Sequence, residues 1–194
     1  MIEKGAEPEP RFFSVIDLTL TEEELRSSVR KRYKSFLNWG EQNIDLRVVD
    51  SNNVKEEDVE SFRLLHIDVA SRETRPKETW DVQYKEIVQD EAFAVFGSKD
   101  GELITASLFN KNKKYCTYSV GASKRELFEK PISHIIMWTG MMTAKAAGCS
   151  YFETGEFYYP HLHDVTEKEL NISNFKSGFG GFTNIILRME LVNK

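Results

Sequence analysis

Apolar and polar positions along the chain follow two periods, one typical of strands and one typical of helices. Runs rich in β-branched and aromatic residues predict strands at 12–18, 45–50, three times between 92 and 122, 150–155 and 183–191. Apolar residues at helical spacing predict helices over 21–37, 56–72, 79–89, 131–148 and within 166–181. The first helix begins at a capping box formed by Thr21 and Glu24. The order of these elements predicts an α/β (α+β) domain built on a mixed central sheet.

Length and composition fit one ordinary globular domain. The chain of 194 residues suffices for a single core, which we expect over 12–194, with residues 1–11 as a flexible lead-in. No apolar run is long enough to span a membrane, and the start is charged and contains proline, unlike a secretory signal. Cys116 and Cys149 lie in apolar stretches and favour a reducing compartment. We therefore expect a cytoplasmic protein that requires no metal or redox cofactor.

Charge limits the classes of partner. The formal net charge of −5 excludes a nucleic-acid footprint over the whole surface. Basic residues nevertheless gather between Arg26 and Lys34. This segment could contact tRNA or an anionic lipid, or could simply be the solvated face of a helix.

The densest candidate site is the string from Asn174 to Phe182, in which Phe175 and Lys176 precede three glycines. Lys176 offers a compact cation that could stabilise an oxyanion or hold a phosphate, with Phe175 shielding it from water. Glycines permit positive φ and close approach of the backbone to a ligand. Those of this string are Gly178, Gly180 and Gly181. The alternative is a helix C-cap with a solvated lysine and core phenylalanines.

Other polar residues could contribute to a site. Arg72 and Arg75 end a helix and could clamp a phosphate or carboxylate, or merely complement the helix dipole. Glu153 and Glu156 lie at the end of a predicted buried strand. Glu153 could accept a proton from an attacking amine if burial raised its pKa, or could simply be an exposed acid at the strand end. His134 lies beside a helix start, where it could contact a ligand or cap the helix.

His161 and His163, with Asp164, could supply three metal ligands. The His-x-His spacing alone is a weak signal, and a polar loop is the simpler interpretation. We therefore predict no metal site.

The string FKSGFGG at 175–181 resembles a motif near the C-terminus of the FemAB family of aminoacyltransferases. The other elements follow the order of that family over residues 12–190, including an entry strand with a basic helix and a crossover helix before the strand ending FETGE. The resemblance implies a GNAT-like N-acyltransferase fold. It also implies transfer of an amino acid from aminoacyl-tRNA to an amine on a peptidoglycan precursor. By that match Lys176 stabilises the transition state at the donor ester, and Phe175 places the donor.

The same resemblance implies the partners. These are the 3′ end of an aminoacyl-tRNA as donor and a cell-envelope or sugar precursor as acceptor. FemAB proteins carry two acyltransferase-like domains, and this chain corresponds to the second. A partner domain or a homodimer could therefore complete the cleft.

Two alternatives remain open. The first is an acetyl-CoA-dependent N-acetyltransferase, in which backbone N–H groups of Gly121 and Ser123 would hold the pyrophosphate. Enzymes of that class carry a further glycine ahead of the crossover helix, which the stretch VGASKRELFEKP lacks. The second alternative is a catalytically silent half-domain that needs a partner.

Overall fold

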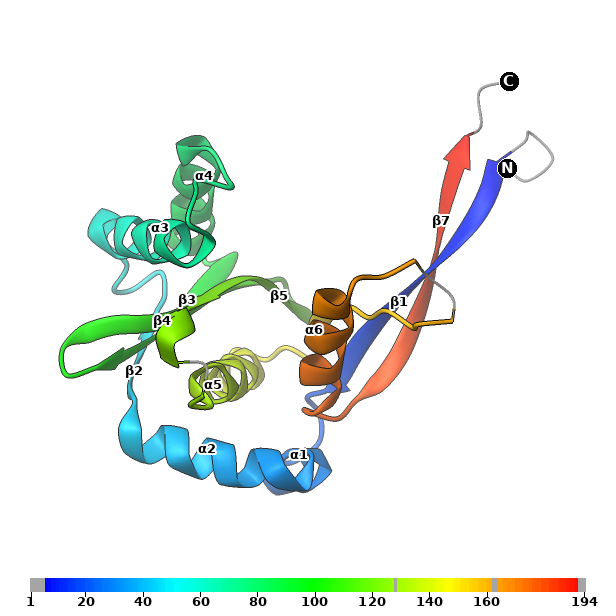
Figure 1. Cartoon of the computed structure of the whole chain (residues 1–194), viewed down its shortest axis with the longest axis horizontal. Helices are drawn as coiled ribbons and strands as arrows, with labels where there is room; N and C mark the ends of the chain where they lie inside the picture. The colour runs from blue at the N-terminus through cyan, green and yellow to red at the C-terminus, as the bar shows by residue number, and fades with distance from the viewer. Residues whose placement is uncertain (1–5, 128, 162–163, 192–194) are drawn as a thin grey trace.

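The computed structural model describes residues 6–127, 129–161 and 164–191. They form a sheet of seven strands with helices on both faces (Figure 1). The strands are β1 (Ala6–Asp17), β2 (Asp45–Val49), β3 (Ala92–Lys99), β4 (Glu102–Lys111), β5 (Tyr115–Ser123), β6 (Tyr151–Glu156) and β7 (Phe182–Leu191). The helices are α1 (Glu22–Ser28), α2 (Lys31–Asn43), α3 (Glu56–Ala70), α4 (Lys77–Val88), α5 (Ile132–Ala146) and α6 (Glu167–Ser177).

The strand order is β2-β3-β4-β5-β6-β1-β7. Every neighbouring pair is antiparallel except β5 and β6, which are parallel and joined by the crossover helix α5. The mixed α/β sheet predicted from the sequence is therefore confirmed, including the antiparallel meander β3-β4-β5. None of the helices in the described part of the chain has the length and apolar character needed to cross a membrane.

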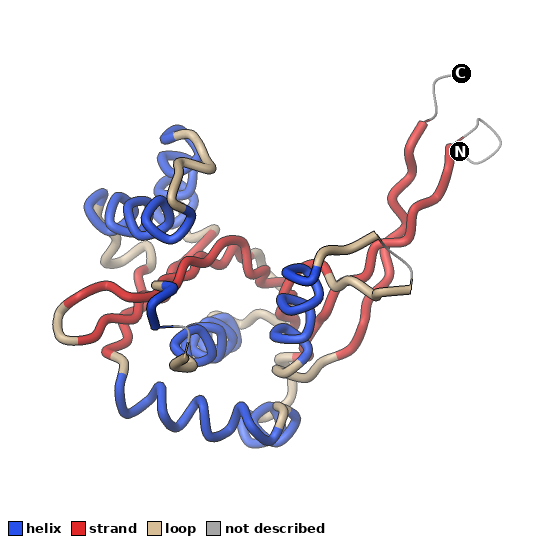
Figure 2. Tube along the Cα trace, viewed as in Figure 1, coloured by secondary structure: helices blue, strands red, loops and turns tan. Residues whose placement is uncertain are grey.

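Each face of the sheet carries its own apolar cluster. Helices α1, α2 and α5 cover one face, where Leu37 and Ile135 pack with Phe109 of β4. Helices α3 and α4 cover the other, where Phe62 and Trp80 pack over the sheet. Figure 2 shows the two helical layers on opposite sides of the strands. Both cysteines are free and buried.

The structure corrects two predictions. The helix predicted over 21–37 is two helices, because Val29 is extended (ψ 148°) and Arg30 N–H donates to the carbonyl of Gly178 at 2.8 Å. A contact with a distant segment thus replaces the local helical bond. Residues 6–11 of the expected lead-in belong to β1, because they pair with β7 from Leu191 to Ile186. Residues 1–5 lie outside the described residues.

The sheet opens between its two parallel strands. β5 pairs with β6 only from Tyr115 to Thr117, opposite Tyr151 to Glu153. Beyond these pairs the two strands separate, and we call this gap the strand opening. Helix α6 lies beside it, next to β1 and the end of β5 (Figure 1). In open α/β sheets ligands bind at the carboxyl ends of parallel strands, so the strand opening is where a site is expected.

Candidate functional site

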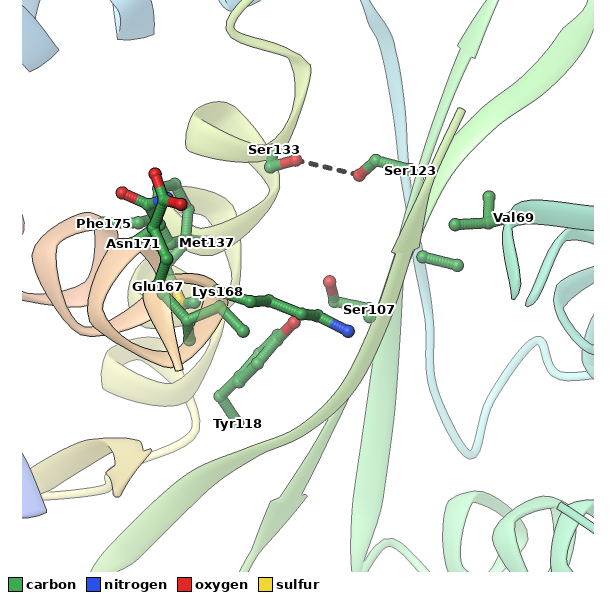
Figure 3. A pocket seen from close by; sticks show the side chains of 13 residues that line it. Val69, Ser107, Tyr118, Ser123, Ser133, Met137, Glu167, Lys168, Asn171 and Phe175 are labelled. Carbon is green, nitrogen blue, oxygen red and sulfur yellow. Dashed lines mark hydrogen bonds between the residues drawn. The ribbon is translucent and has the colours of Figure 1, made fainter. Parts of the chain in front are cut away.

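A cavity of about 710 Å³ adjoins the strand opening, between β5, α5 and α6 (Figure 3). Its sheet wall consists of Ser107, Tyr118, Gly121, Ala122 and Ser123. The helical walls consist of Ser133 and Met137 from α5, five residues of α6 from Glu167 to Phe175, and Val69 at the end of α3. The cavity is therefore framed by β4 and β5 on one side and by α5 and α6 on the other.

Hydroxyl groups line the sheet side of this cavity. The Ser123 hydroxyl is 2.8 Å from that of Thr105 and 2.8 Å from that of Ser133, which forms a continuous chain. The Tyr118 hydroxyl lies beside the Ser107 hydroxyl, and Gly121 leaves room for it, because a side chain there would collide with both. Burial raises the pKa of Tyr118, so its phenol remains a protonated donor. This wall can orient a polar ligand by hydrogen bonds.

One face of α6 forms the opposite wall. Lys168, Asn171 and Phe175 follow one another at helical spacing, which turns all three toward the cavity. In Figure 3 the Lys168 side chain extends across the cavity toward Ser107. The helix begins at a capping box, in which Thr166 N–H donates to Glu169 at 2.8 Å and Glu169 N–H donates to the Thr166 hydroxyl at 3.3 Å.

Lys176 lies on the β6 side of α6. Its ammonium donates to the carbonyl oxygen of Glu156 at 3.1 Å. A side chain at Gly155, whose φ is +94°, would come within 2.9 Å of that nitrogen. The strand therefore makes room for the lysine by placing glycine at this position.

Lys176 and Glu153 alter each other's proton affinity. Burial lowers the pKa of Lys176, and the nearby Glu156 and Glu153 partly oppose this effect. Burial also raises the pKa of Glu153, which Lys176 partly opposes. An ammonium has three donors, and among the described residues one of them is directed at the Glu156 carbonyl, so Lys176 can donate to a further oxygen. The pair thus offers a partly desolvated cation beside a carboxylate with raised proton affinity.

An aromatic cluster packs on the other side of Phe175. The rings of Tyr33, Phe36 and Phe175 surround His134, with centroids 4.4, 4.8 and 5.0 Å from the imidazole. Burial lowers the pKa of His134 to about 4, so its ring is neutral at physiological pH. The Tyr33 hydroxyl donates to the Phe175 carbonyl at 3.1 Å, which fixes α6 against α2.

A second cavity of about 470 Å³ lies over this cluster. Arg30, Arg32 and Lys130 line it with His134 and with the acidic residue Glu129, so cationic side chains predominate. Phe175 and Asn171 line both cavities and form the wall between them. A ligand with an anionic end and a flat apolar part would suit this second cavity.

The glycines of the FKSGFGG string make packing contacts and line neither cavity. Gly178 lies against the Tyr33 ring, where a side chain would collide with it. Gly180 and Gly181 have φ of +84° and +92° and approach Ser28 and the backbone of Val15. These contacts dock the end of α6 on α1, α2 and β1.

Other predicted site residues are distributed over the fold. Gly121 and Ser123 line the first cavity, but both belong to β5, paired with Ser107 and Thr105 of β4. Arg72 and Arg75 lie in the connection between α3 and α4 and line neither cavity described above. His161 is exposed, and His163 lies outside the described residues. In the described ranges no three His, Cys, Asp or Glu side chains converge as a metal site.

Sequence reasoning missed most of the polar wall. Tyr118, Ser107 and Lys168 were not predicted as site residues. The sequence carries no distinct signal for the first two, because polar and apolar residues are mixed along both strands.

No family model and no curated protein matches the sequence. Among solved structures, the chain is similar to the C-terminal domain (DUF2156) of a putative lysylphosphatidylglycerol synthetase from Agrobacterium fabrum, with TM-score 0.74 and 14% identity over 97% of this chain and 62% of that one. It is similar to FemX with TM-score 0.69 and 12% identity, over 89% of this chain and 59% of that one.

A tandem GNAT protein from the clavulanic acid biosynthesis pathway gives TM-score 0.55 and 13% identity, over 98% of this chain and 56% of that one. The chain therefore spans about three fifths of the length of these structures. At such low identities the similarity concerns the fold. The chain has a GNAT-like N-acyltransferase fold of the kind found in FemX and in the DUF2156 domain.

Proposed function

We propose that the chain is an acyltransferase that moves an aminoacyl group from the 3′ end of an aminoacyl-tRNA to an amine of a cell-envelope or sugar precursor. The observation that carries this proposal is the half-buried Lys176, whose ammonium lies at the end of β6 near Glu153, on the helix that also forms one wall of the hydroxyl-lined cavity. A cation in this position suits a reaction whose barrier depends on developing negative charge.

The fold supports the reaction class. Two of the similar structures are FemX and a domain of a putative lysylphosphatidylglycerol synthetase, and another is named a GNAT protein. The FKSGFGG resemblance independently selects Lys176, whose ammonium donates to the Glu156 carbonyl at the end of β6.

Lys176 and Glu153 each have one role in the proposed reaction. The acceptor amine attacks the carbonyl carbon of the donor ester, and the carbonyl oxygen gains negative charge. Lys176 donates a hydrogen bond to that oxygen. Glu153, whose pKa is raised by burial, takes the proton that the attacking amine loses. Glu153 then returns this proton to the 3′-oxygen as the C–O bond of the ester breaks, so that an amide forms and the 3′-hydroxyl leaves.

The two cavities suit the donor. The hydroxyls of Tyr118, Ser107 and Ser123 can orient the aminoacyl part. The cations and rings around His134 can hold the terminal nucleotide, whose phosphate is anionic and whose base is flat. Phe175, shared by both cavities, would place the ester between them.

Among the described residues near the start of α5, few free backbone N–H groups could bind the pyrophosphate of acetyl-CoA. The loop between β5 and α5 has no glycine, and Gly121 lies within the β4–β5 ladder. At the start of α5, two N–H groups are already engaged, because Ile132 donates to Lys130 and His134 donates to Pro131. Fewer backbone donors therefore remain for a pyrophosphate.

Calorimetric titration distinguishes the donors. The titrants are a non-hydrolysable amide mimic of an aminoacyl-tRNA 3′ end and acetyl-CoA. The proteins are the unaltered chain, Lys176→Ala, and Lys99→Ala as a control that removes an equal charge from the exposed end of β3. The mimic should bind the unaltered chain and Lys99→Ala alike, and about tenfold or more weakly to Lys176→Ala, which loses a charge-assisted hydrogen bond.

Two outcomes would contradict the proposal. Tight binding of acetyl-CoA that is indifferent to Lys176 would assign acetyl transfer instead. Binding of neither titrant would favour a catalytically silent half-domain that needs a partner to complete the cleft.

A further inference from the structure

The strands β1 and β7 form a two-stranded ribbon that extends past the end of β6. β7 is the last strand of the sheet, and its pairing with β1 continues to Ala6, whereas β6 pairs with β1 only from Phe13 onward. Figure 2 shows the ribbon projecting away from the body of the molecule. Isolated two-stranded ribbons are marginally stable in water. The backbone groups along its two edges determine whether it can pair with a further strand, which would stabilise it.

Proline blocks the β1 edge of the ribbon. The carbonyl of Phe12 accepts from Phe157 N–H at 2.7 Å, on the side away from β7. Backbone groups alternate in direction along a strand, so Pro8 and Pro10 face the same side as Phe12. Proline has no N–H and cannot donate to another strand. This edge is protected against pairing, as exposed edges usually are.

The β7 edge is not protected. Its even-numbered residues exchange hydrogen bonds with the odd-numbered residues of β1, so Thr183, Ile185, Leu187 and Met189 direct their N–H and C=O groups outward. The strand contains no proline. In the described part of the chain, no strand pairs with this edge.

The side chains of β7 are also unusually apolar for an exposed strand. Ile185, Ile186 and Leu187 are 58%, 47% and 60% exposed, and Phe182 is 52% exposed. These residues point to both faces of the ribbon because they are consecutive. An open edge flanked by exposed apolar residues on both faces is a template for strand pairing.

We propose that β7 pairs with β7 of a second copy of the chain, antiparallel and centred on Ile186. The two-fold axis then places Ile185 opposite Leu187 of the second copy, and Asn184 opposite Arg188. Thr183 lies opposite Met189. In this register each residue whose N–H and C=O point outward lies opposite another such residue. No two like charges lie opposite each other.

A second copy suits this edge because the pairing is self-complementary. The same residues serve both sides of an isologous interface, which is the commonest symmetry of soluble dimers. Each ribbon gains a third strand, and one sheet runs through both copies. The inference is independent of the proposed chemistry, because none of these residues touches Lys176 or the cavities.

A charge-swap experiment tests the register. Ile186→Lys places two lysines opposite each other across the two-fold axis, and Ile186→Glu does the same with two glutamates. We expect sedimentation and light scattering to show a dimer for the unaltered chain and a monomer for each variant. Mixing the two variants should restore a dimer with one copy of each, detected by native mass spectrometry.

A proline substitution tests the backbone separately. Leu187→Pro removes an outward N–H and spares the β1–β7 hydrogen bonds, so it should also give a folded monomer. Circular dichroism establishes folding for each variant, and this second substitution keeps the test valid if one variant does not fold. A monomeric unaltered chain, a dimer that persists in Ile186→Lys, or a mixture that stays monomeric would each overturn the proposal.

Discussion

The two halves of the sheet, on either side of the strand opening, are built differently. Strands β2 to β5 carry helices on both faces, and their central aromatic residues Phe93 and Phe109 are fully buried. In the second half, β7 leaves much of its apolar surface exposed, at Phe182 and from Ile185 to Leu187. The first half supplies most of the core and therefore the folding free energy, whereas the second offers surface for association. The candidate site lies between the two halves, at the strand opening.

The largest expected effect is a difference between the two halves in how much a substitution to alanine lowers the free energy of unfolding. Phe109→Ala should lower the free energy of unfolding by about 3–5 kcal/mol, because it opens a cavity in the packed half. Ile185→Ala, measured by urea unfolding in the Ile186→Lys background, should change it by less than about 0.5 kcal/mol. Equal losses in the two variants would show that the halves are not distinct.

The next effect depends on pH and tests the packing between α5 and α6. His134 has its pKa lowered to about 4 by burial, against an ordinary value of 6.5. Between these values the unfolded chain binds more protons than the folded chain, so stability falls as pH falls from 6.5 to 4. Since each pH unit corresponds to about 1.4 kcal/mol, the loss is at most about 3 kcal/mol.

Urea unfolding across this pH range measures the loss, with His134→Phe as the control that cannot titrate. The difference in slope between the two proteins isolates the histidine from the carboxyl groups. Identical slopes would mean that the imidazole is not held neutral in the folded state.

A smaller effect tests the docking of α6 on the first half. Gly178→Ala places a methyl group against the Tyr33 ring, so we expect a loss of about 1–3 kcal/mol from overpacking. Combining it with Tyr33→Leu, which clears the space, should cost less than the sum of the single variants. Simple additivity in this double-mutant cycle would contradict the contact.

The smallest effect concerns the start of α6. Thr166→Ala removes the hydroxyl that accepts from Glu169 N–H, which should cost about 1 kcal/mol. Thr166→Ser retains the cap and serves as the control. Thermal unfolding that does not distinguish alanine from serine would show that the cap contributes nothing.

Much of the fold could be predicted from the sequence because local patterns and tertiary packing agree. The meander β3-β4-β5, the crossover helix and the capping box at Thr21 all follow from short-range signals. The break at Val29 could not be predicted, because Leu25, Val29 and Phe36 keep helical spacing across it. The first helix ends there, where Arg30 N–H donates to Gly178, a residue distant in the sequence.

The candidate site was predictable only in part. The FKSGFGG string identifies Lys176, and its surroundings, including Glu156 and Gly155, appear only when β6 is folded against α6. Tyr118 lies in a strand like any core aromatic residue, and nothing in its spacing shows that its hydroxyl faces a cavity. Likewise residues 6–11 were predicted to belong to a flexible lead-in, although their Pro8 and Pro10 form the blocked edge of a ribbon that depends on β7.

The most direct test of the site is a crystal structure of the chain with the aminoacyl-tRNA 3′-end mimic. The account predicts the mimic between β5 and α6, with its carbonyl oxygen within hydrogen-bonding distance of Lys176 Nζ and its nucleotide beside Phe175. A groove of about 760 Å³ between α3 and α4, with Glu57, Trp80 and Asp81 among its lining residues, is an alternative place at which the mimic could bind. A mimic bound there, with Lys176 still engaged only by Glu156, would contradict the account.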